Sequence, residues 1–190
     1  MHPLIRLMMK TKQEIRKEMA GMRRQVSAEN RALWSAAVQE QIEKEECFLQ
    51  ADTVLAYYPM PDELDLRNLL IKWLGMKRLV LPIVVGDDIR LKVYEGEERM
   101  RPGRFGILEP DTEEWFEDWQ SIDCILVPGV AFTPDGARMG RGKGYYDRFL
   151  PQVPKASKIG VCYPFQLVDE VPVNADDRFM DKVISGHIPE

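Results

Sequence analysis

The sequence predicts a three-layer α/β/α fold with a mainly parallel sheet, preceded by two N-terminal helices. From Thr53 onward, short apolar runs alternate with turn residues and helical segments, an arrangement typical of α/β proteins. Continuously apolar runs such as Leu79-Val80-Leu81 suit strands that are covered on both faces. The length of 190 residues, compared with about 150 per domain, favours a single domain over residues 1–190.

Two helices are expected at the N-terminus. Thr11 and Glu14 fit a capping box for a helix over residues 12–25. Apolar residues recur on it at helical spacing: Ile15, Met19, Met22 and Val26. Ser27 can cap a second helix that runs to about Glu46. Its expected buried stripe is Leu33, Ala37, Val38 and Ile42. We expect the two helices to pack antiparallel.

Five strands are expected after the helices. They cover residues 54–58, 79–85, 89–94, 122–127 and 159–163. Between the first two, Asp65 can cap a helix and Gly75 can end it. That helix presents Leu66, Leu69, Leu70 and Trp73. Strand, helix and strand in this order predict a right-handed parallel crossover.

Composition excludes several classes of protein. The chain is 45% apolar and 30% charged, which is ordinary for a globular protein and not for a disordered one. No apolar run approaches the roughly 18 residues that a membrane helix needs. The first nine residues lack the features of a secretory signal. Cys47, Cys124 and Cys162 are too few and too widely spaced for a disulfide framework or a CxxC metal site, so we expect a cytoplasmic protein.

Positive charge is concentrated at the N-terminus. The whole chain carries a net charge of −5, but residues 1–31 hold eight basic and three acidic side chains. A solvated amphipathic helix, a nucleic-acid arm and a phosphate clamp are three interpretations of this pattern. Nucleic-acid binding is the weakest of them, because the segment lacks interleaved aromatic residues.

A glycine-rich segment follows the fourth expected strand. Glycines stand at 136, 140, 142 and 144, just before a helix that opens near Tyr145. Alternate glycines let backbone amides converge on an anion at a helix N-terminus. Between residues 136 and 150 there are four basic side chains and one acidic one. An oligophosphate ligand is the natural inference, although the spacing fits neither a Walker A loop nor a Rossmann fingerprint. A basic surface turn is the alternative.

Several motifs together resemble those of the 5-formyltetrahydrofolate cyclo-ligase family, also called methenyltetrahydrofolate synthetases. They are Lys12 with Arg16, Tyr58 with Glu63, residues 105–110, the glycine-rich segment and Asp177. The resemblance covers nearly the whole chain, and residues 1–10 are expected to be an unmatched extension. It implies a fold akin to the phosphosugar-isomerase and CoA-transferase group. It also implies ATP- and Mg²⁺-dependent conversion of 5-formyltetrahydrofolate to 5,10-methenyltetrahydrofolate.

The resemblance also implies roles for individual residues. ATP would be bound by Lys12, Arg16, Arg138, Gly140, Arg141, Gly142, Lys143, Gly144 and Asp147. The folate would be bound by Tyr58, Glu63, Phe105, Lys143, Gly144, Tyr145 and Tyr146. Mg²⁺ would be held by Asp147 and Asp177, and the catalytic residues would be Arg138, Lys143 and Tyr145. The chain departs from the family pattern at Asp176, where a histidine is usual, and at Leu66, where a threonine is common.

Plain structural interpretations stay open beside these roles. Asp147 could be a first-turn helix acid, and Asp177 could form an ion pair with Arg178. Phe105 could be a core aromatic residue and Glu63 a solvated loop acid. A non-catalytic sensor of phosphorylated ligands on the same scaffold is the alternative to an enzyme. For partners, we expect 5-formyltetrahydrofolate and ATP, no nucleic acid, no membrane, and a monomer or a weak homodimer.

Overall fold

A six-stranded sheet forms the centre of the protein. The computed structural model describes residues 10–103 and 106–186. The strand order is β10-β9-β6-β1-β2-β3, and all neighbours are parallel except β2 and β3. The strands are β1 (Thr53–Leu55), β2 (Arg78–Val85), β3 (Asp88–Val93), β6 (Cys124–Val127), β9 (Ser157–Cys162) and β10 (Lys182–Ser185). The five expected strands and the mainly parallel sheet are therefore confirmed, and β10 is an additional edge strand.

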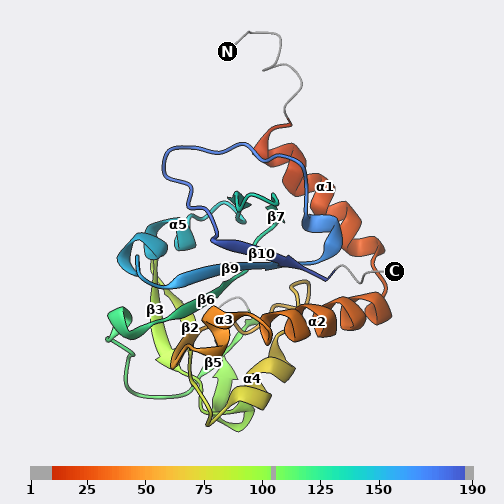
Figure 1. Ribbon diagram of the computed structural model, residues 1–190. Helices are drawn as coiled ribbons and strands as arrows, with labels where there is room; N and C mark the ends of the chain where they lie inside the picture. The colour runs from red at the N-terminus through yellow and green to blue at the C-terminus, as the bar shows by residue number, and fades with distance from the viewer. Residues whose placement is uncertain (1–9, 104–105, 187–190) are drawn as a thin grey trace.

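Helices cover both faces of the sheet, as Figure 1 shows. One face carries α2 (Ala28–Ile42), α3 (Glu46–Leu49) and α4 (Arg67–Trp73), and the other carries α5 (Tyr145–Phe149) with the 3-10 turn η5 (Leu150–Gln152). In β6, Cys124 and Leu126 pack into the first layer, while Ile125 and Val127 pack into the second. The three-layer prediction is confirmed because the continuously apolar strands are buried on both sides.

The remaining elements are short. Two small hairpins flank the sheet, one of β4 (Met100–Pro102) with β5 (Leu108–Pro110), the other of β7 (Ala131–Phe132) with β8 (Arg138–Met139). Three further 3-10 turns are η2 (Glu97–Arg99), η4 (Trp119–Ser121) and η6 (Pro164–Gln166). These segments lie outside the expected strands because two- and three-residue strands leave little trace in apolar periodicity.

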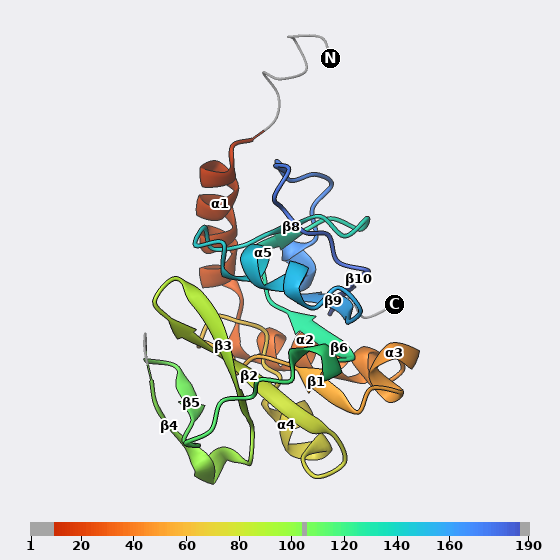
Figure 2. The same cartoon turned by 90° about the vertical axis from the view of Figure 1, so that its left-hand side faces the viewer.

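The first crossover forms as predicted. β1 and β2 are parallel, with Val54 opposite Leu79, and Figure 2 shows α4 beneath them. The N-cap of α4 is Leu66, which makes no side-chain capping hydrogen bond, and not Asp65 as predicted; the Asp65 carboxylate, one residue earlier, accepts a hydrogen bond from the Arg67 backbone at 2.9 Å. After α4, Gly75 adopts a φ of +80°, which a residue with a side chain rarely does. The chain can therefore turn sharply into β2.

The first helix, α1 (Lys12–Gln25), has the expected bounds and capping box. Its buried face differs from the expected one: Ile15 and Met19 are buried, but Met22 is 40% exposed. Arg23 is buried in its place, at 8% exposure. Residues 15, 19 and 23 are four apart and share one face of the helix, which lies against β7 and η6. A polar partner for Arg23, described below, makes this burial possible.

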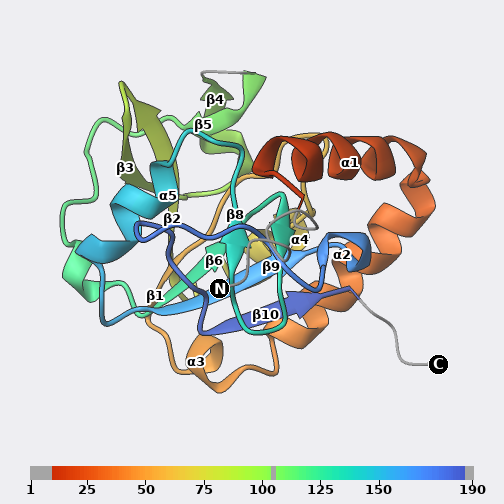
Figure 3. The same cartoon turned by 90° about the horizontal axis from the view of Figure 1, so that it is seen from above.

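The second helix is shorter than predicted. Ser27 caps α2, but the helix ends at Ile42, where i to i+3 hydrogen bonds from Lys44 and Glu45 turn the chain into α3. Val38 and Ile42 are buried as expected, whereas Leu33 is 51% exposed. The two N-terminal helices diverge from their junction instead of packing antiparallel, because α2 packs beside β10 while α1 contacts β7 and η6 (Figure 3).

The cysteines are free thiols, as expected. Cys124 and Cys162 are buried, and Cys47 is partly exposed. Burial raises the pKa of the Cys162 thiol to about 12, so that it stays protonated at neutral pH. Within the described residues, no helix is long and apolar enough to span a bilayer.

Candidate functional site

The glycine loop, residues 140–144, connects β8 to α5. Gly142 and Gly144 have φ values of +101° and +67°, in the left-handed region that favours glycine. A side chain at Gly142 would begin 3.3 Å from the Arg16 guanidinium carbon, so α1 approaches the loop closely. The helix opens at Tyr145 as predicted but is only five residues long. Its dipole is therefore small, and an anion here would depend on cations and loop amides.

The cations of α1 reach two distant segments. Lys12 Nζ lies 2.6 Å from Asp177 Oδ2, and Arg16 Nε donates to the Gly140 carbonyl at 3.1 Å. Burial alone would raise the pKa of Asp177, but hydrogen bonds from Lys12 and from the Asn174 backbone hold that pKa below its ordinary value. The partner of Asp177 is thus Lys12, not its neighbour Arg178. Helix α1, the glycine loop and the C-terminal segment meet here.

A second ion pair joins β8 to α5. Arg138 is 7% exposed; its Nη1 lies 3.2 Å from Asp147 Oδ1, and its Nε donates to the Pro128 carbonyl at 3.0 Å. Burial lowers the pKa of this guanidinium, whereas the charges of Asp147 and Asp177 raise it. The two carboxylates expected to hold Mg²⁺ therefore act on the same buried cation.

A cavity of about 410 Å³ opens beside the glycine loop. Its walls come from the loop after β1, from the β2–β3 hairpin, from β5 and from β8 with the glycine loop and α5. The predicted site residues that line it are Tyr58, Glu63, Arg138, Gly140, Arg141, Lys143, Gly144, Tyr145, Tyr146 and Asp147. Lys12, Arg16, Gly142 and Asp177 are described but do not line it, and Phe105 lies outside the described residues. The structure thus brings most of the predicted site together.

Glu63 is a buried acid of this cavity. Its side chain is 13% exposed, and burial raises the pKa of the carboxyl group. One oxygen, Oε2, accepts a hydrogen bond from the Met60 backbone at 3.1 Å. The other, Oε1, lies 3.4 Å from Arg141 Nη2. Glu63 is therefore not a solvated loop acid.

Tyrosines in the cavity wall contribute both aromatic rings and hydroxyl groups. The hydroxyl of Tyr146 is buried and has no hydrogen-bond partner among the described residues. Burial raises its pKa, so it remains a donor at neutral pH. Arg138 lies over the Tyr146 ring at 5.1 Å from its centroid. Tyr58 donates its hydroxyl proton to Glu97 Oε1 at 3.0 Å.

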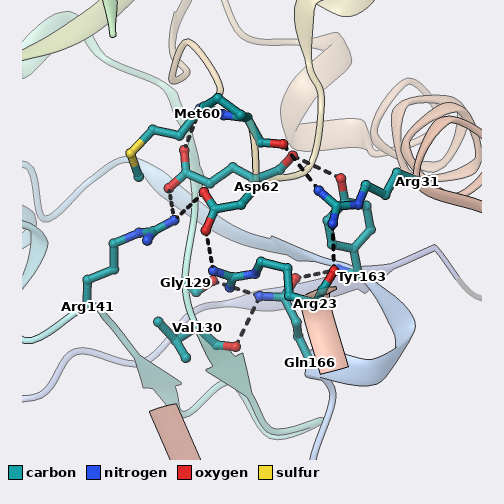
Figure 4. Close-up of polar contacts among 11 residues, drawn as sticks. Arg23, Arg31, Met60, Asp62, Gly129, Val130, Arg141, Tyr163 and Gln166 are labelled. Carbon is teal, nitrogen blue, oxygen red and sulfur yellow. Dashed lines mark hydrogen bonds and ion pairs between the residues drawn. The ribbon is translucent and has the colours of Figure 1, made fainter. Parts of the chain in front are cut away.

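Sequence reasoning missed four polar residues of this region. They are Arg23, Tyr57, Asp62 and Arg148. Tyr57 lines the cavity, and Arg148 donates to the Lys143 carbonyl at 3.0 Å. Asp62 contacts both Arg23 and Arg141, as Figure 4 shows. Three of them stand next to a predicted site residue in the sequence, namely Tyr57, Asp62 and Arg148, whereas Arg23 does not.

The family is established by comparison of the whole chain. The sequence pattern of the 5-formyltetrahydrofolate cyclo-ligase family matches residues 8–186. The chain belongs to this family. As a member of the cyclo-ligase family it is an enzyme of the ligase class. The cyclo-ligase of Mycolicibacterium smegmatis is 34% identical to it over 144 residues, which cover 70% of this chain and 73% of that protein.

Two solved structures of methenyltetrahydrofolate synthetases resemble this cyclo-ligase family member. That of Aquifex aeolicus has a TM-score of 0.82 at 37% identity, covering 92% of this chain and 89% of the other. That of Mycoplasma pneumoniae has a TM-score of 0.74 at 26% identity, covering 92% and 98%. The two departures from the family pattern lie outside the cavity: Leu66 is fully buried in the core, and Asp176 is exposed.

Proposed function

We propose that the protein converts 5-formyltetrahydrofolate to 5,10-methenyltetrahydrofolate, with ATP as co-substrate and Mg²⁺ as the metal. The observation that carries this proposal is the single cavity lined both by the basic glycine loop and by the buried acid Glu63. A loop with Arg138 and Lys143 suits phosphate, and a buried carboxylate suits a ligand rich in N–H donors. A cavity that joins both allows transfer between two bound molecules.

The chemistry requires an activated oxygen. The oxygen of the formyl group that is attached to N5 is a poor leaving group, so it must be phosphorylated before the ring can close. The formyl oxygen attacks the γ-phosphorus of ATP, the bond to the β-phosphate oxygen breaks, and ADP leaves. N10 then forms a bond to the formyl carbon and gives up its proton to the phosphate, and inorganic phosphate departs with the formyl oxygen. Such transfers are catalysed mainly by positioning and by neutralising charge.

In the proposed reaction, residues of the glycine loop and of α1 bind the phosphates of ATP. Lys143 is exposed at the mouth of the cavity, where its ammonium can meet a transferring phosphoryl group. Arg138 is fixed by Asp147 and the Pro128 carbonyl, so its charge is held in one place. From α1, Arg16 contacts the same loop and Lys12 is paired with Asp177, and both would supply further charge for the polyphosphate.

The carboxylates present fit Mg²⁺. This ion prefers oxygen ligands and usually needs only one or two carboxylates besides phosphate oxygens and water. Asp147 and Asp177 would be such ligands; Asp147 contacts the buried guanidinium of Arg138, and the charge of Asp177 also acts on it. No group of three or more metal-binding side chains occurs in the part of the chain that the structure describes. When bound, the ion would neutralise negative charge on the phosphates.

In the proposed reaction, the loop after β1 and the tyrosines of the cavity bind the folate. Glu63 would accept hydrogen bonds from the pterin N–H groups, and Tyr58 and Tyr145 offer aromatic surface to a flat ring. The Tyr146 hydroxyl, which is buried without a hydrogen-bond partner among the described residues, would donate to a polar atom of the ligand. The apolar walls of β2 and β3 exclude water from the reacting groups.

The test is an ultraviolet assay for the methenyl product. Purified protein is mixed with 5-formyltetrahydrofolate, ATP and Mg²⁺, and each component is omitted in turn. Product should appear only when ATP and a divalent metal are both present. Binding of ATP without product under any metal condition would contradict the proposed reaction and would favour a sensor of phosphorylated ligands.

A further inference from the structure

Asp62 joins three segments that are far apart in the sequence. Its Oδ2 lies 2.6 Å from Arg23 Nη1 at the end of α1, and its Oδ1 lies 2.9 Å from Arg141 Nη2 in the glycine loop. The same Arg141 nitrogen lies 3.4 Å from Glu63 Oε1. Figure 4 shows this row of alternating guanidinium and carboxylate groups. Arg141 is thus shared between two adjacent acids, and the shorter contact is to Asp62.

Arg23 anchors one end of this row. Its side chain is 10% exposed, and its Nε is buried without a hydrogen-bond partner in the described part of the chain. Asp62 is the carboxylate that compensates this buried charge. Because the charge of Arg23 is out of water, its attraction for Asp62 is screened little, and the carboxylate is held in place. The charges of Arg141 and Arg23 keep the pKa of Asp62 below its ordinary value, although burial opposes them.

The backbone around the two acids is also fixed. Arg31 Nη1 donates to the Pro61 carbonyl at 3.3 Å, and the Tyr163 hydroxyl donates to the Glu63 carbonyl at 2.9 Å. The Arg141 side chain, by contrast, is 44% exposed. The group free to move is therefore the guanidinium of Arg141, and its choice of partner decides whether Glu63 is neutralised.

We propose that Asp62 is a positioning residue: anchored by Arg23, it draws the Arg141 guanidinium toward itself, so that Arg141 makes only a long hydrogen bond of 3.4 Å to Glu63 Oε1, which the substrate can replace. This inference rests on the proposed function, in which Glu63 accepts hydrogen bonds from the folate. Without the Asp62 carboxylate, Arg141 turns to the one remaining acid beside it, which is Glu63. A paired Glu63 is a poorer acceptor for the ligand, so the affinity for folate falls.

The test is a double-mutant cycle on folate binding. Calorimetry measures the dissociation constant of 5-formyltetrahydrofolate without ATP for the wild type, Asp62→Asn, Arg141→Gln and the double variant. Asp62→Asn should weaken binding on the order of tenfold, as expected for the loss of one charge-assisted acceptor. In the Arg141→Gln background the same substitution should have almost no effect, because the group that it positions is gone. A merely structural role of Asp62 would give the same loss in both backgrounds and would overturn the proposal.

A matched control and a second variant keep the test decisive. Asp111→Asn also removes an aspartate paired with an arginine, Arg101 at 3.2 Å, but away from the cavity, and should leave folate affinity unchanged. If Asp62→Asn does not fold, Arg23→Met with Asp62→Asn removes the buried cation together with its partner and should show the same loss. Wild-type affinity in that variant contradicts the proposal.

Failure of the proposed function would look different. If the wild type bound no 5-formyltetrahydrofolate, the proposed function would be wrong and this role of Asp62 with it. If the wild type bound the folate and Asp62→Asn bound it equally well, only the role of Asp62 would be wrong. The ATP- and metal-dependent assay of wild-type turnover tests the proposed function alone, because it involves no variant of Asp62.

Discussion

The two sides of the cavity treat charge in opposite ways. On the side of α1 and the glycine loop, cations and carboxylates are paired with one another: Arg138 with Asp147 at 3.2 Å in the cavity wall, and Lys12 with Asp177 at 2.6 Å outside it. On the side of the loop after β1, Glu63 is buried, its pKa is raised by that burial, and its shortest contact is a neutral backbone N–H.

This difference indicates what each side is built to receive. When paired groups exchange partners, each charge keeps an oppositely charged neighbour. In the proposed function, the cations would pair with phosphates while the carboxylates bind Mg²⁺. A buried acid with incomplete compensation instead gains most from a ligand that brings its own N–H donors. The phosphate side is therefore a set of exchangeable ion pairs, and the folate side is an acceptor that its ligand stabilises.

The largest effect is expected from Lys143→Ala. Lys143 is exposed, so folding should be unchanged, but a charge-assisted contact to the transferring phosphate should be lost. Such a contact is worth about 1.5 to 3 kcal/mol, which corresponds to roughly a tenfold to hundredfold loss in turnover. Steady-state kinetics measure the loss, and Lys155→Ala, another exposed lysine, is the control. Wild-type turnover in Lys143→Ala would mean that the glycine loop is a basic surface turn without a role in the reaction.

A smaller effect is expected for the carboxylates of the phosphate side. Asp147→Asn and Asp177→Asn each keep the shape of the side chain but remove a charge, so half-maximal activity should need several-fold more Mg²⁺. Titration of the metal at saturating ATP measures this. Unchanged titrations in both variants would mean that neither aspartate holds the ion, and would leave the two ion pairs with a structural role alone.

The buried carboxylate of Glu63, on the folate side, should lower the Tm of the protein at neutral pH. Because burial raises the pKa of Glu63 above its ordinary value of 4.5, folding favours the protonated form. This contribution is fully present below pH 4.5 and is lost as the pH rises through the pKa of the folded state. At neutral pH the wild type therefore carries the cost of a buried carboxylate that Glu63→Gln lacks. The Tm of Glu63→Gln without ligand should exceed that of the wild type at pH 7, and the difference should vanish toward pH 4.

The sign of that difference is the informative result. Glu63→Gln should be more stable and yet bind folate more weakly, as expected where a binding site retains an unfavourable buried charge. A Tm difference of the opposite sign at neutral pH would mean that Arg141 already compensates Glu63. The two sides of the cavity would then treat charge alike.

Much of the fold could be predicted because its elements carry strong local signals. The capping box of Thr11 and Glu14 fixed the start of α1, and the continuous apolar runs identified the central strands. The hairpin strands β4, β5, β7 and β8 were missed, because two or three residues show no clear period. The edge strand β10 was missed because only its two central residues, Val183 and Ile184, are apolar. Leu33 was expected inside but is exposed, since periodicity does not tell which face of a helix meets a sheet.

The site was predictable where a residue type is tied to a ligand. The glycine loop was found in this way, whereas Glu63 was predicted from the family resemblance, and both line one cavity. Arg23 was not found, because a buried arginine on a helix has the same sequence pattern as a solvated one. Its burial depends on Asp62, which is 39 residues away, and local sequence holds no trace of such a pair. Residues that act through a tertiary contact therefore need the structure.

The central claim is that one cavity has two sides with separate ligands, and reciprocal binding measurements test it most directly. Calorimetry gives the affinity of Glu63→Gln and of Arg16→Ala for 5-formyltetrahydrofolate and for ATP, each ligand alone. Glu63→Gln should lose folate affinity roughly tenfold and keep its ATP affinity, because a neutral acceptor replaces a charged one. Arg16→Ala should do the reverse, because it removes a guanidinium beside the glycine loop. Equal loss of both ligands in both variants, with thermal stability intact, would contradict the division into two sides.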